Sequence, residues 1–215
     1  MKKSKKFKKM AALVLSFAFV CNITSSTSAS KTGSSPHAQI LYNSTYTGTE
    51  QQLRTAFSNA TAGFKSTFGI TFTLDYVSSS SALSRPRSCT GVCSTSCCGS
   101  SNCDTAHGNS GRRLLKKMSS TYTFRIGVVG HALCGGDGKN HIGISGVAEF
   151  PDESRRAVIT TNTVYSLKYL MQHELSHNLG VWTHCSGKSE CVMNEDLEYT
   201  DKWCTAHSNM IKNNK

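Results

Sequence analysis

The 215-residue sequence predicts an α+β domain in which short strands and long helices share one core. Three patterns predict this class. Apolar and polar residues alternate over 70–77, as in a half-buried strand. Apolar residues recur at helical spacing over 49–68, and the helical spacing returns from Val164 onward. One domain is expected, because domains commonly hold about 100 to 200 residues.

The predicted strands are short runs rich in β-branched and aromatic residues. They cover residues 38–42, 70–77, 122–129, 142–150 and 157–161. The fourth run contains Gly143 and Gly146, which suggest a bulge or a place where another segment approaches closely.

Two helices carry clear start and stop signals. Thr49 can cap the first helix, 49–68, and Gly69 can end it. In the second helix the apolar residues fall at positions 164, 167, 171 and 175, with Asn162 or Thr163 as the expected cap. Gly180 can end this helix by adopting a positive φ.

The N-terminal segment 1–29 has the order of a secretory signal peptide. Six lysines precede the apolar run 10–21, and small residues follow at Thr27-Ser28-Ala29. The run is shorter than the roughly 20 residues that span a bilayer, so no stable membrane insertion is expected after its removal. A lipid anchor on Cys21 is disfavoured, because the residues before it lack the small side chains that a lipoprotein peptidase requires. A secreted protein is therefore expected.

Export changes how the charge is interpreted. The full chain carries 24 basic and 13 acidic residues, a net charge of +11. Removing six lysines with residues 1–29 leaves 18 basic and 13 acidic residues, or +5. This modest charge gives no reason to expect a nucleic-acid partner.

The cysteines are expected to form disulfides, because an exported chain meets an oxidising compartment. Nine of the ten cysteines follow residue 29, so at least one of these cannot pair within the chain. Five of them crowd into 89–103, within a Cys-rich insertion at 85–110. A metal cluster is disfavoured in this insertion, because the segment lacks a paired C-x-x-C spacing.

The chemistry is predicted by the segment HELSHNLGVWTH. His173 and His177 are four residues apart, so they face one side of a helix and can bind one Zn²⁺ ion. Glu174 points away from that face but can reach a metal-bound water. Gly180 allows the sharp turn that returns His184 to the same ion. The full pattern is HExxHxxGxxH, typical of a catalytic zinc site with three histidine ligands and one open position.

This segment resembles the metzincin clan of zinc metallopeptidases. Met193, nine residues after His184, resembles the clan's Met-turn, which lies beneath the zinc. The resemblance implies a twisted five-stranded sheet, mostly parallel, with 142–150 as the antiparallel edge strand that pairs with substrate. It also implies two long helices and a third helix over 200–212. The catalytic domain would cover 30–215, with an upper subdomain at about 37–180 and a lower one at 181–215.

The stretch HNLG and the cysteine before Met193 most resemble the adamalysin/reprolysin branch. The chain departs from that branch at Cys185, where Asp often follows the third histidine. Glu195 stands where astacin-like and serralysin-like members carry a tyrosine, so no tyrosine ligand is expected. The other histidines (37, 107, 131, 141 and 207) are expected to be surface or structural residues, and Trp182 is expected to pack.

The expected function is a secreted zinc-dependent endopeptidase that acts on protein or peptide substrates. One catalytic zinc would be held by His173, His177 and His184, with Glu174 as general base. The alternative is a non-catalytic, zinc-containing, disulfide-rich binding module. The carboxylate of Glu174 argues against it, because a structural zinc site does not need that group. Neither the cleavage specificity nor the oligomeric state can be read from the sequence.

Overall fold

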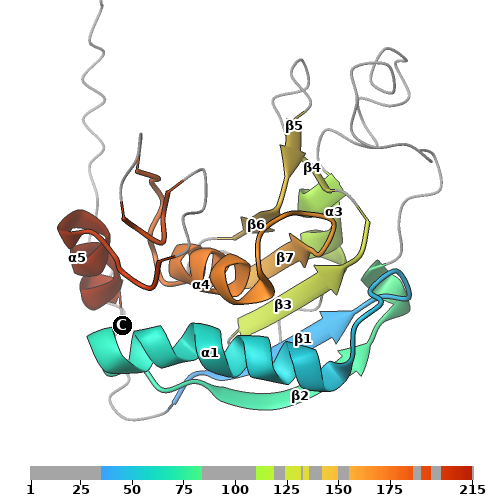
Figure 1. The fold of residues 1–215 in the computed structure, drawn as a ribbon, viewed down its shortest axis with the longest axis horizontal. Helices are drawn as coiled ribbons and strands as arrows, with labels where there is room; N and C mark the ends of the chain where they lie inside the picture. The colour runs from blue at the N-terminus through green and yellow to red at the C-terminus, as the bar shows by residue number, and fades with distance from the viewer. Residues whose placement is uncertain are drawn as a thin grey trace, which may run out of the picture. The chain divides into compact units, whose positions relative to one another are not determined.

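A five-stranded sheet of order β2-β1-β3-β7-β6 organises the fold (Figure 1). The computed structural model describes residues 35–83, 110–118, 124–131, 133–135, 142–149, 155–185, 190–194 and 200–214. All of them lie in one compact unit, Thr32–Lys215. The sheet strands are β1 (His37–Tyr42), β2 (Thr73–Ser79), β3 (Phe124–Val129), β6 (Gly146–Ala148) and β7 (Arg156–Thr160).

Four of these strands are parallel and one edge strand is reversed. β1 pairs in parallel with β2 and β3, and β3 pairs in parallel with β7. Only β6 is antiparallel, with Val147 opposite Val158 of β7. The predicted α+β class and mixed five-stranded sheet are confirmed.

Helix α1 (Glu50–Phe68) follows its local signals closely. Thr49 Oγ1 accepts a hydrogen bond from the Gln52 amide, and the Gln52 side chain accepts one from the Thr49 amide. This capping box satisfies two amides that the helix itself leaves without partners. Gly69 ends the helix at φ 71°, where its N–H donates to Lys65 O.

Two apolar clusters lie on opposite faces of the sheet, because successive strand side chains alternate between faces. Phe124, Ile126 and Val128 belong to the larger cluster, which α1 and α4 (Leu167–Asn178) complete. Val129 belongs to the smaller cluster, beneath α3 (Ser110–Lys117) and the short 3₁₀ helix η1 (Ser81–Leu83). Helix α3 begins at the last residue of the predicted insertion 85–110, and no helix was predicted there from the sequence.

The predicted strand 142–150 is two strands. β5 (Ile142–Ile144) pairs with β4 (Leu133–Gly135) in a separate two-stranded sheet, and only β6 joins the main sheet. The chain bends at Ser145, whose carbonyl accepts a hydrogen bond from the Thr160 amide.

The second helix begins later than its apolar spacing predicted. α4 starts after Ser166, and Val164, expected on its buried face, is 83% exposed. Thr163 is not the cap of this helix, because the cap position is Ser166. The Thr163 hydroxyl lies 3.0 Å from that of Ser145 and accepts a hydrogen bond from the Tyr165 amide before the helix begins. The last helix, α5 (Thr205–Asn214), also starts later than predicted.

Several predictions fall outside the described residues. These are the signal peptide at 1–29, the Cys-rich run at 89–103, and the expectations for His107, His141 and Glu195. Within the described part, no helix has both the length and the apolar character needed to cross a membrane.

Candidate metal centres

Helix α4 carries the first three residues of the predicted site, His173, Glu174 and His177. His173 Nδ1 lies 2.8 Å from Val192 O, and His177 Nδ1 contacts Val181 O. A carbonyl can only accept, so both Nδ1 atoms must carry the proton. Each Nε2 is therefore left with a free lone pair, the form in which imidazole binds a metal.

The turn after α4 returns the chain to these two rings. Gly180 has φ 92°, a conformation that a residue with a Cβ adopts only at a cost. Its N–H donates to His177 O, and Val181 N–H donates to Ser176 O. The reversal places His184 Nε2 at 3.2 Å from His173 Nε2 and 3.1 Å from His177 Nε2.

The three ring nitrogens fit one tetrahedral zinc ion. Zn–N bonds of about 2.0 to 2.1 Å at tetrahedral angles separate two ligand nitrogens by about 3.3 Å. The observed separations, 3.1 and 3.2 Å, are close to this value. Burial lowers the pKa of His173 to about 3 and that of His177 to about 4, so both are neutral near pH 7. His184 is exposed, so this centre is open to solvent on one side.

Glu174 directly follows His173 on α4 and is buried. Burial raises the pKa of its carboxyl to about 8. Within the described part of the chain, Oε2 has no hydrogen-bond partner. Burying an ionised carboxylate without a hydrogen-bond donor or a positive charge beside it is costly. A buried carboxyl with a raised pKa is therefore a candidate for a functional role.

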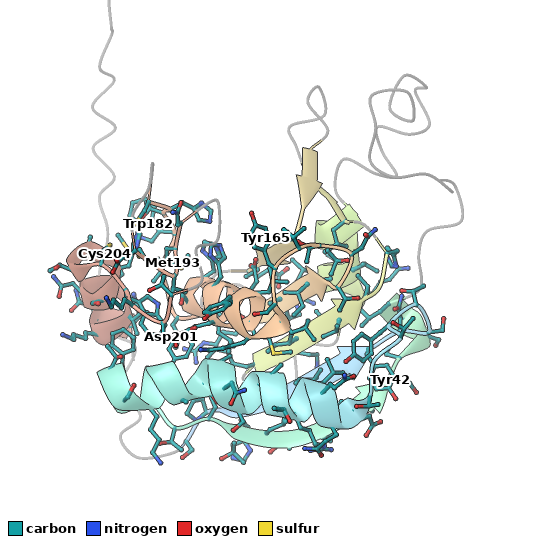
Figure 2. All side chains as sticks on the ribbon, viewed as in Figure 1. Tyr42, Tyr165, Trp182, Met193, Asp201 and Cys204 are labelled. Atoms are coloured by element: carbon teal, nitrogen blue, oxygen red, sulfur yellow. The ribbon has the colours of Figure 1, made fainter. Side chains whose placement is uncertain are left out.

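Met193 lies fully buried in the turn that follows the third histidine. Its carbonyl accepts a hydrogen bond from the Cys185 amide, and Cys185 and Asn194 form a short parallel bridge. The predicted Met-turn therefore lies against the residue after His184. Trp182, which was expected to pack, is instead 66% exposed (labelled in Figure 2).

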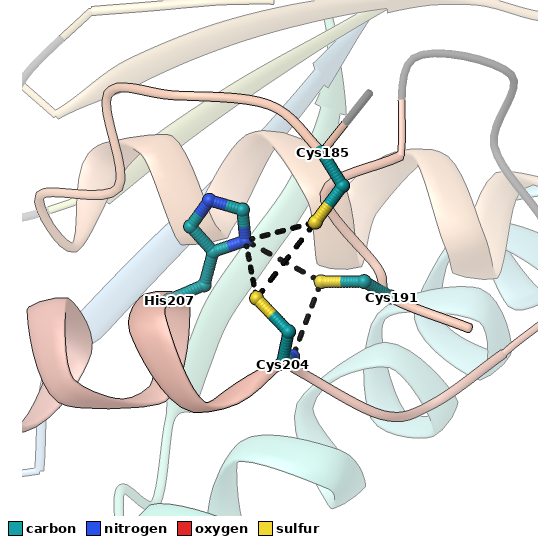
Figure 3. A group of neighbouring side chains, drawn as sticks. All are labelled: Cys185, Cys191, Cys204 and His207. Carbon is teal, nitrogen blue, oxygen red and sulfur yellow. Dashed lines mark hydrogen bonds between the residues drawn. The ribbon is translucent and has the colours of Figure 1, made fainter. Parts of the chain in front are cut away.

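A second cluster, which the sequence analysis missed, lies directly beside the first. Cys185, Cys191, Cys204 and His207 bring their ligand atoms within 4.8 Å of one another (Figure 3). His207 Nδ1 lies 3.6, 3.4 and 3.2 Å from the sulfurs of Cys185, Cys191 and Cys204. Thr183 Oγ1, 3.0 Å from His207 Nε2, holds the other side of the ring.

The disulfide prediction is wrong for these three cysteines, which are free. The sulfurs of Cys185 and Cys204 are 3.7 Å apart, whereas a disulfide bond is about 2.05 Å long. Zn–S bonds of about 2.3 Å at tetrahedral angles instead place two sulfurs about 3.8 Å apart. The Cys₃His donor set therefore fits a closed zinc site with four protein ligands. His207, expected to be a surface or structural residue, is buried and contributes the one nitrogen of this candidate set.

The sequence did contain a signal for this second cluster. Cys204 and His207 stand three residues apart at the start of α5, and Cys185 and Cys191 flank the loop before Met193. The close Cys204–His207 spacing is compatible with two ligands to one structural zinc ion. The disulfide prediction was preferred to a zinc site because the protein was expected to be exported to an oxidising compartment.

No protein-family model matches the sequence, and no curated protein is significantly similar to it. Among solved structures, 37 chains match. Archaemetzincin from Methanopyrus kandleri has a TM-score of 0.56 and 18% identity, covering 84% of this chain and 96% of that one. Metalloproteinase-II from Bacteroides fragilis has a TM-score of 0.47 and 12% identity, covering 83% of this chain and 52% of that one. The likeness to archaemetzincin shows that the two chains share a fold.

Proposed function

We propose that the protein is a zinc-dependent endopeptidase of the metzincin type. One observation carries the proposal. Three histidine Nε2 atoms converge to within about one zinc coordination sphere, and a buried carboxylate follows the first of them on the same helix. The fold shared with archaemetzincin supports it. Membership of the adamalysin/reprolysin branch stays a prediction.

His173, His177 and His184 would hold the catalytic ion. When bound, zinc supplies a Lewis acid that polarises the scissile carbonyl and lowers the pKa of a coordinated water toward about 7. The chain's contribution is orientation. The carbonyls of Val192 and Val181 fix the rings of His173 and His177, so that little reorganisation is needed when the metal binds.

Glu174 is the proposed general base. Its buried carboxyl has a pKa of about 8 without metal, and a nearby cation lowers a carboxyl pKa, so this group would titrate closer to the working pH. It accepts a proton from the attacking water and then delivers it to the leaving amine. The carboxylate form therefore acts as the base in the first half of the reaction, and the protonated form acts as the acid in the second.

The edge strand β6 is the proposed binding surface for an extended peptide substrate. It is the last strand of the sheet, and its Gly146 lies against Glu174. A substrate added as a further strand would thus run past the general base. Because such pairing uses main-chain hydrogen bonds in the middle of a peptide, it favours endopeptidase action.

The Cys₃His cluster is the proposed site of a second, structural zinc ion. All four ligand positions come from the protein, so no position is left for substrate or water. Burial raises the pKa of the Cys191 thiol to about 12, so the bare cluster holds its proton, which metal binding must displace.

Secretion after removal of residues 1–29 is part of the proposal. Protein or peptide substrates are the expected partners, and no nucleic-acid partner is expected. Sequencing the N-terminus of the protein recovered outside the cell tests the secretion step. A mature protein that begins near residue 30 supports it, and a protein that stays inside with Met1 intact contradicts it.

The decisive experiment is a peptide-library cleavage profile with zinc analysis of the wild type and Glu174→Gln. We expect cleavage by the wild type and a loss of about 10²- to 10⁴-fold in Glu174→Gln, with the zinc content unchanged. Glu50→Gln, far along the chain at the start of α1, is the matched control and should keep full activity. Zinc binding with no cleavage of any peptide would favour the binding-module alternative.

A further inference from the structure

Gly146, in the edge strand β6, faces the carboxylate of Glu174 with no space between them. An ideal Cβ at position 146 would lie 3.0 Å from Glu174 Cγ, 2.8 Å from Cδ and nearer still to Oε1. All three separations are shorter than side chains tolerate without movement. Any residue other than glycine at this position must therefore displace either the strand or the Glu174 side chain.

The strand has little freedom to move at its first end. Gly146 pairs with Ile159 of β7, and the preceding Ser145 carbonyl accepts a hydrogen bond from the Thr160 amide at 2.9 Å. The Ser145 hydroxyl also lies 3.0 Å from that of Thr163. Main-chain pairing and a side-chain contact thus hold the backbone immediately before Gly146.

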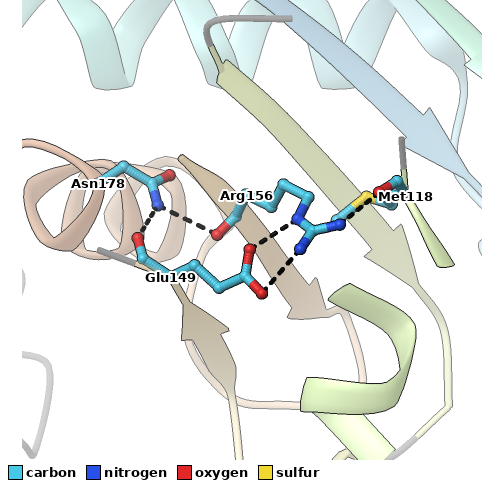
Figure 4. A network of polar contacts seen from close by, with 4 residues as sticks. All are labelled: Met118, Glu149, Arg156 and Asn178. Atoms are coloured by element: carbon cyan, nitrogen blue, oxygen red, sulfur yellow. Dashed lines mark hydrogen bonds and ion pairs between the residues drawn. The ribbon is translucent and has the colours of Figure 1, made fainter. Parts of the chain in front are cut away.

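The other end of the strand is held by a polar network (Figure 4). Arg156 forms a two-pronged ion pair with Glu149, at 2.6 Å from Nε and 3.0 Å from the second guanidinium nitrogen. The Asn178 amide nitrogen donates to Glu149 O and to Arg156 O. Asn178 is the last residue of α4, so this network ties β6 directly to the helix that carries Glu174.

The backbone of α4 is held as well. Leu170, Met171 and Leu175 are fully buried in the main core, and the His173 ring is bonded to Val192 O. With strand and helix both fixed, the Glu174 carboxylate is the group that must move.

We propose that Gly146 is a positioning residue, whose missing side chain leaves the space in which the Glu174 carboxylate is held for catalysis. The inference rests on the proposed role of Glu174 as general base. Of the described glycines, only Gly69 and Gly180 have a positive φ, so the backbone at 146 accepts alanine without strain. Gly146→Ala therefore tests the added Cβ alone.

The activity test compares the full-length wild type with Gly146→Ala on a peptide that the wild type cleaves. We expect kcat to fall about 10- to 100-fold, because a displacement of about 1 Å has this effect on a catalytic group. We expect KM to change less than about threefold and the zinc content to stay equal, because the histidine ligands are untouched. An unchanged kcat in a folded, zinc-loaded variant overturns the inference.

Gly127→Ala is the matched control. Gly127 also lies in a strand of the main sheet, and its added Cβ would meet Leu83, Met118 and Val158 at 3.2 Å, all on the face beneath α3. This variant should lower Tm while its kcat stays at the wild-type value. A kcat loss equal to that of Gly146→Ala would show that crowding anywhere in the sheet has this effect, and the inference would fail.

A stability cycle tests the contact even if Gly146→Ala folds poorly. The alanine at 146 is introduced both into the wild type and into Glu174→Ala, which has no carboxylate to collide with. We expect a clear fall in Tm in the first background and little or none in the second, as for two residues in direct contact. Equal falls in both would overturn the inference. A wild type that cleaves no peptide would refute the proposed function instead, and this cycle would still decide the contact.

Discussion

The two candidate metal centres are neighbours in the chain, since His184 belongs to one and Cys185 to the other, yet they differ in construction. The histidine centre has three ligands, an exposed His184 on one side and a buried carboxylate beside it. The cysteine centre has four ligands, and Cys191 and His207 are buried. An open position is what catalysis requires, whereas a complete ligand set serves the fold.

The two centres use different ligand atoms, nitrogen in one and mainly sulfur in the other, and these atoms suit different roles. Imidazole is neutral, so three histidines leave zinc with its full charge to act on water and substrate. Thiolates neutralise that charge and bind more tightly, which suits a centre that holds loops together. The Cys₃His cluster joins the turn after α4, the Met-turn and α5, which the Cys185–Met193 and Thr183–His207 hydrogen bonds also connect.

The largest expected effect comes from breaking the cysteine centre. In Cys191→Ser we expect the lower subdomain to lose its fold and Tm to fall by about 10 °C or more, because structural zinc supplies folding free energy directly. His184→Ala in the open centre should abolish activity with a much smaller change in Tm. Thermal unfolding and zinc analysis of both variants test the contrast. Equal Tm losses would show that the two centres do not differ in role.

A smaller effect is expected from the charge of Glu174 in metal-free protein. Its folded-state pKa of about 8 lies above the ordinary 4.5, so the folded state holds the proton more tightly. The resulting stability is complete below pH 4.5 and is lost as the pH rises through about 8. Glu174→Gln has no such loss, so it should be more stable than the wild type by up to a few kcal/mol at pH 9.

Denaturant unfolding of both chelated proteins at pH 4.5 and pH 9 measures this difference. The histidines titrate in both proteins and cancel in the comparison. A stability gap between the wild type and Glu174→Gln that stays constant with pH would contradict the assignment of a buried, neutral Glu174.

The smallest expected effect is at Gly180, in the turn between His177 and His184 of the histidine centre. In Gly180→Ala, φ 92° becomes strained and the added Cβ would meet the Asn214 side chain, 2.7 Å from Cγ. We expect a loss of about 1 to 2 kcal/mol and weaker zinc binding at His184. Gly69→Ala is the control, because Gly69 has φ 71° but nothing within 4 Å of its Cβ position. It should lose stability with no change in zinc affinity. Zinc titration that finds the two variants alike would contradict a role for Gly180 in placing His184.

Local signals explain which elements the sequence predicted well. Helix α1 has its cap at Thr49 and its end at Gly69, both within a few residues of the helix itself. The start of α4 was predicted too early because Val164 fits the apolar spacing of the helix. In the structure Val164 is exposed, and the neighbouring Thr163 contacts Ser145 next to the edge strand. The sequence predicted one strand over 142–150, whereas the structure has two. The break could not be predicted because each half pairs with a different strand.

The histidine centre could be predicted from the sequence, because its ligands are set by one helical turn and one glycine. His173 and His177 share a helix face at any position in a fold, and Gly180 allows the return of His184. The cysteine centre and the Gly146–Glu174 contact depend on how the elements pack. Cys204 and His207 reach Cys185 only when α5 packs, and β6 reaches α4 only when the sheet forms. Residue spacing predicts contacts within one turn of a helix, whereas contacts between separate helices and strands depend on how these elements pack.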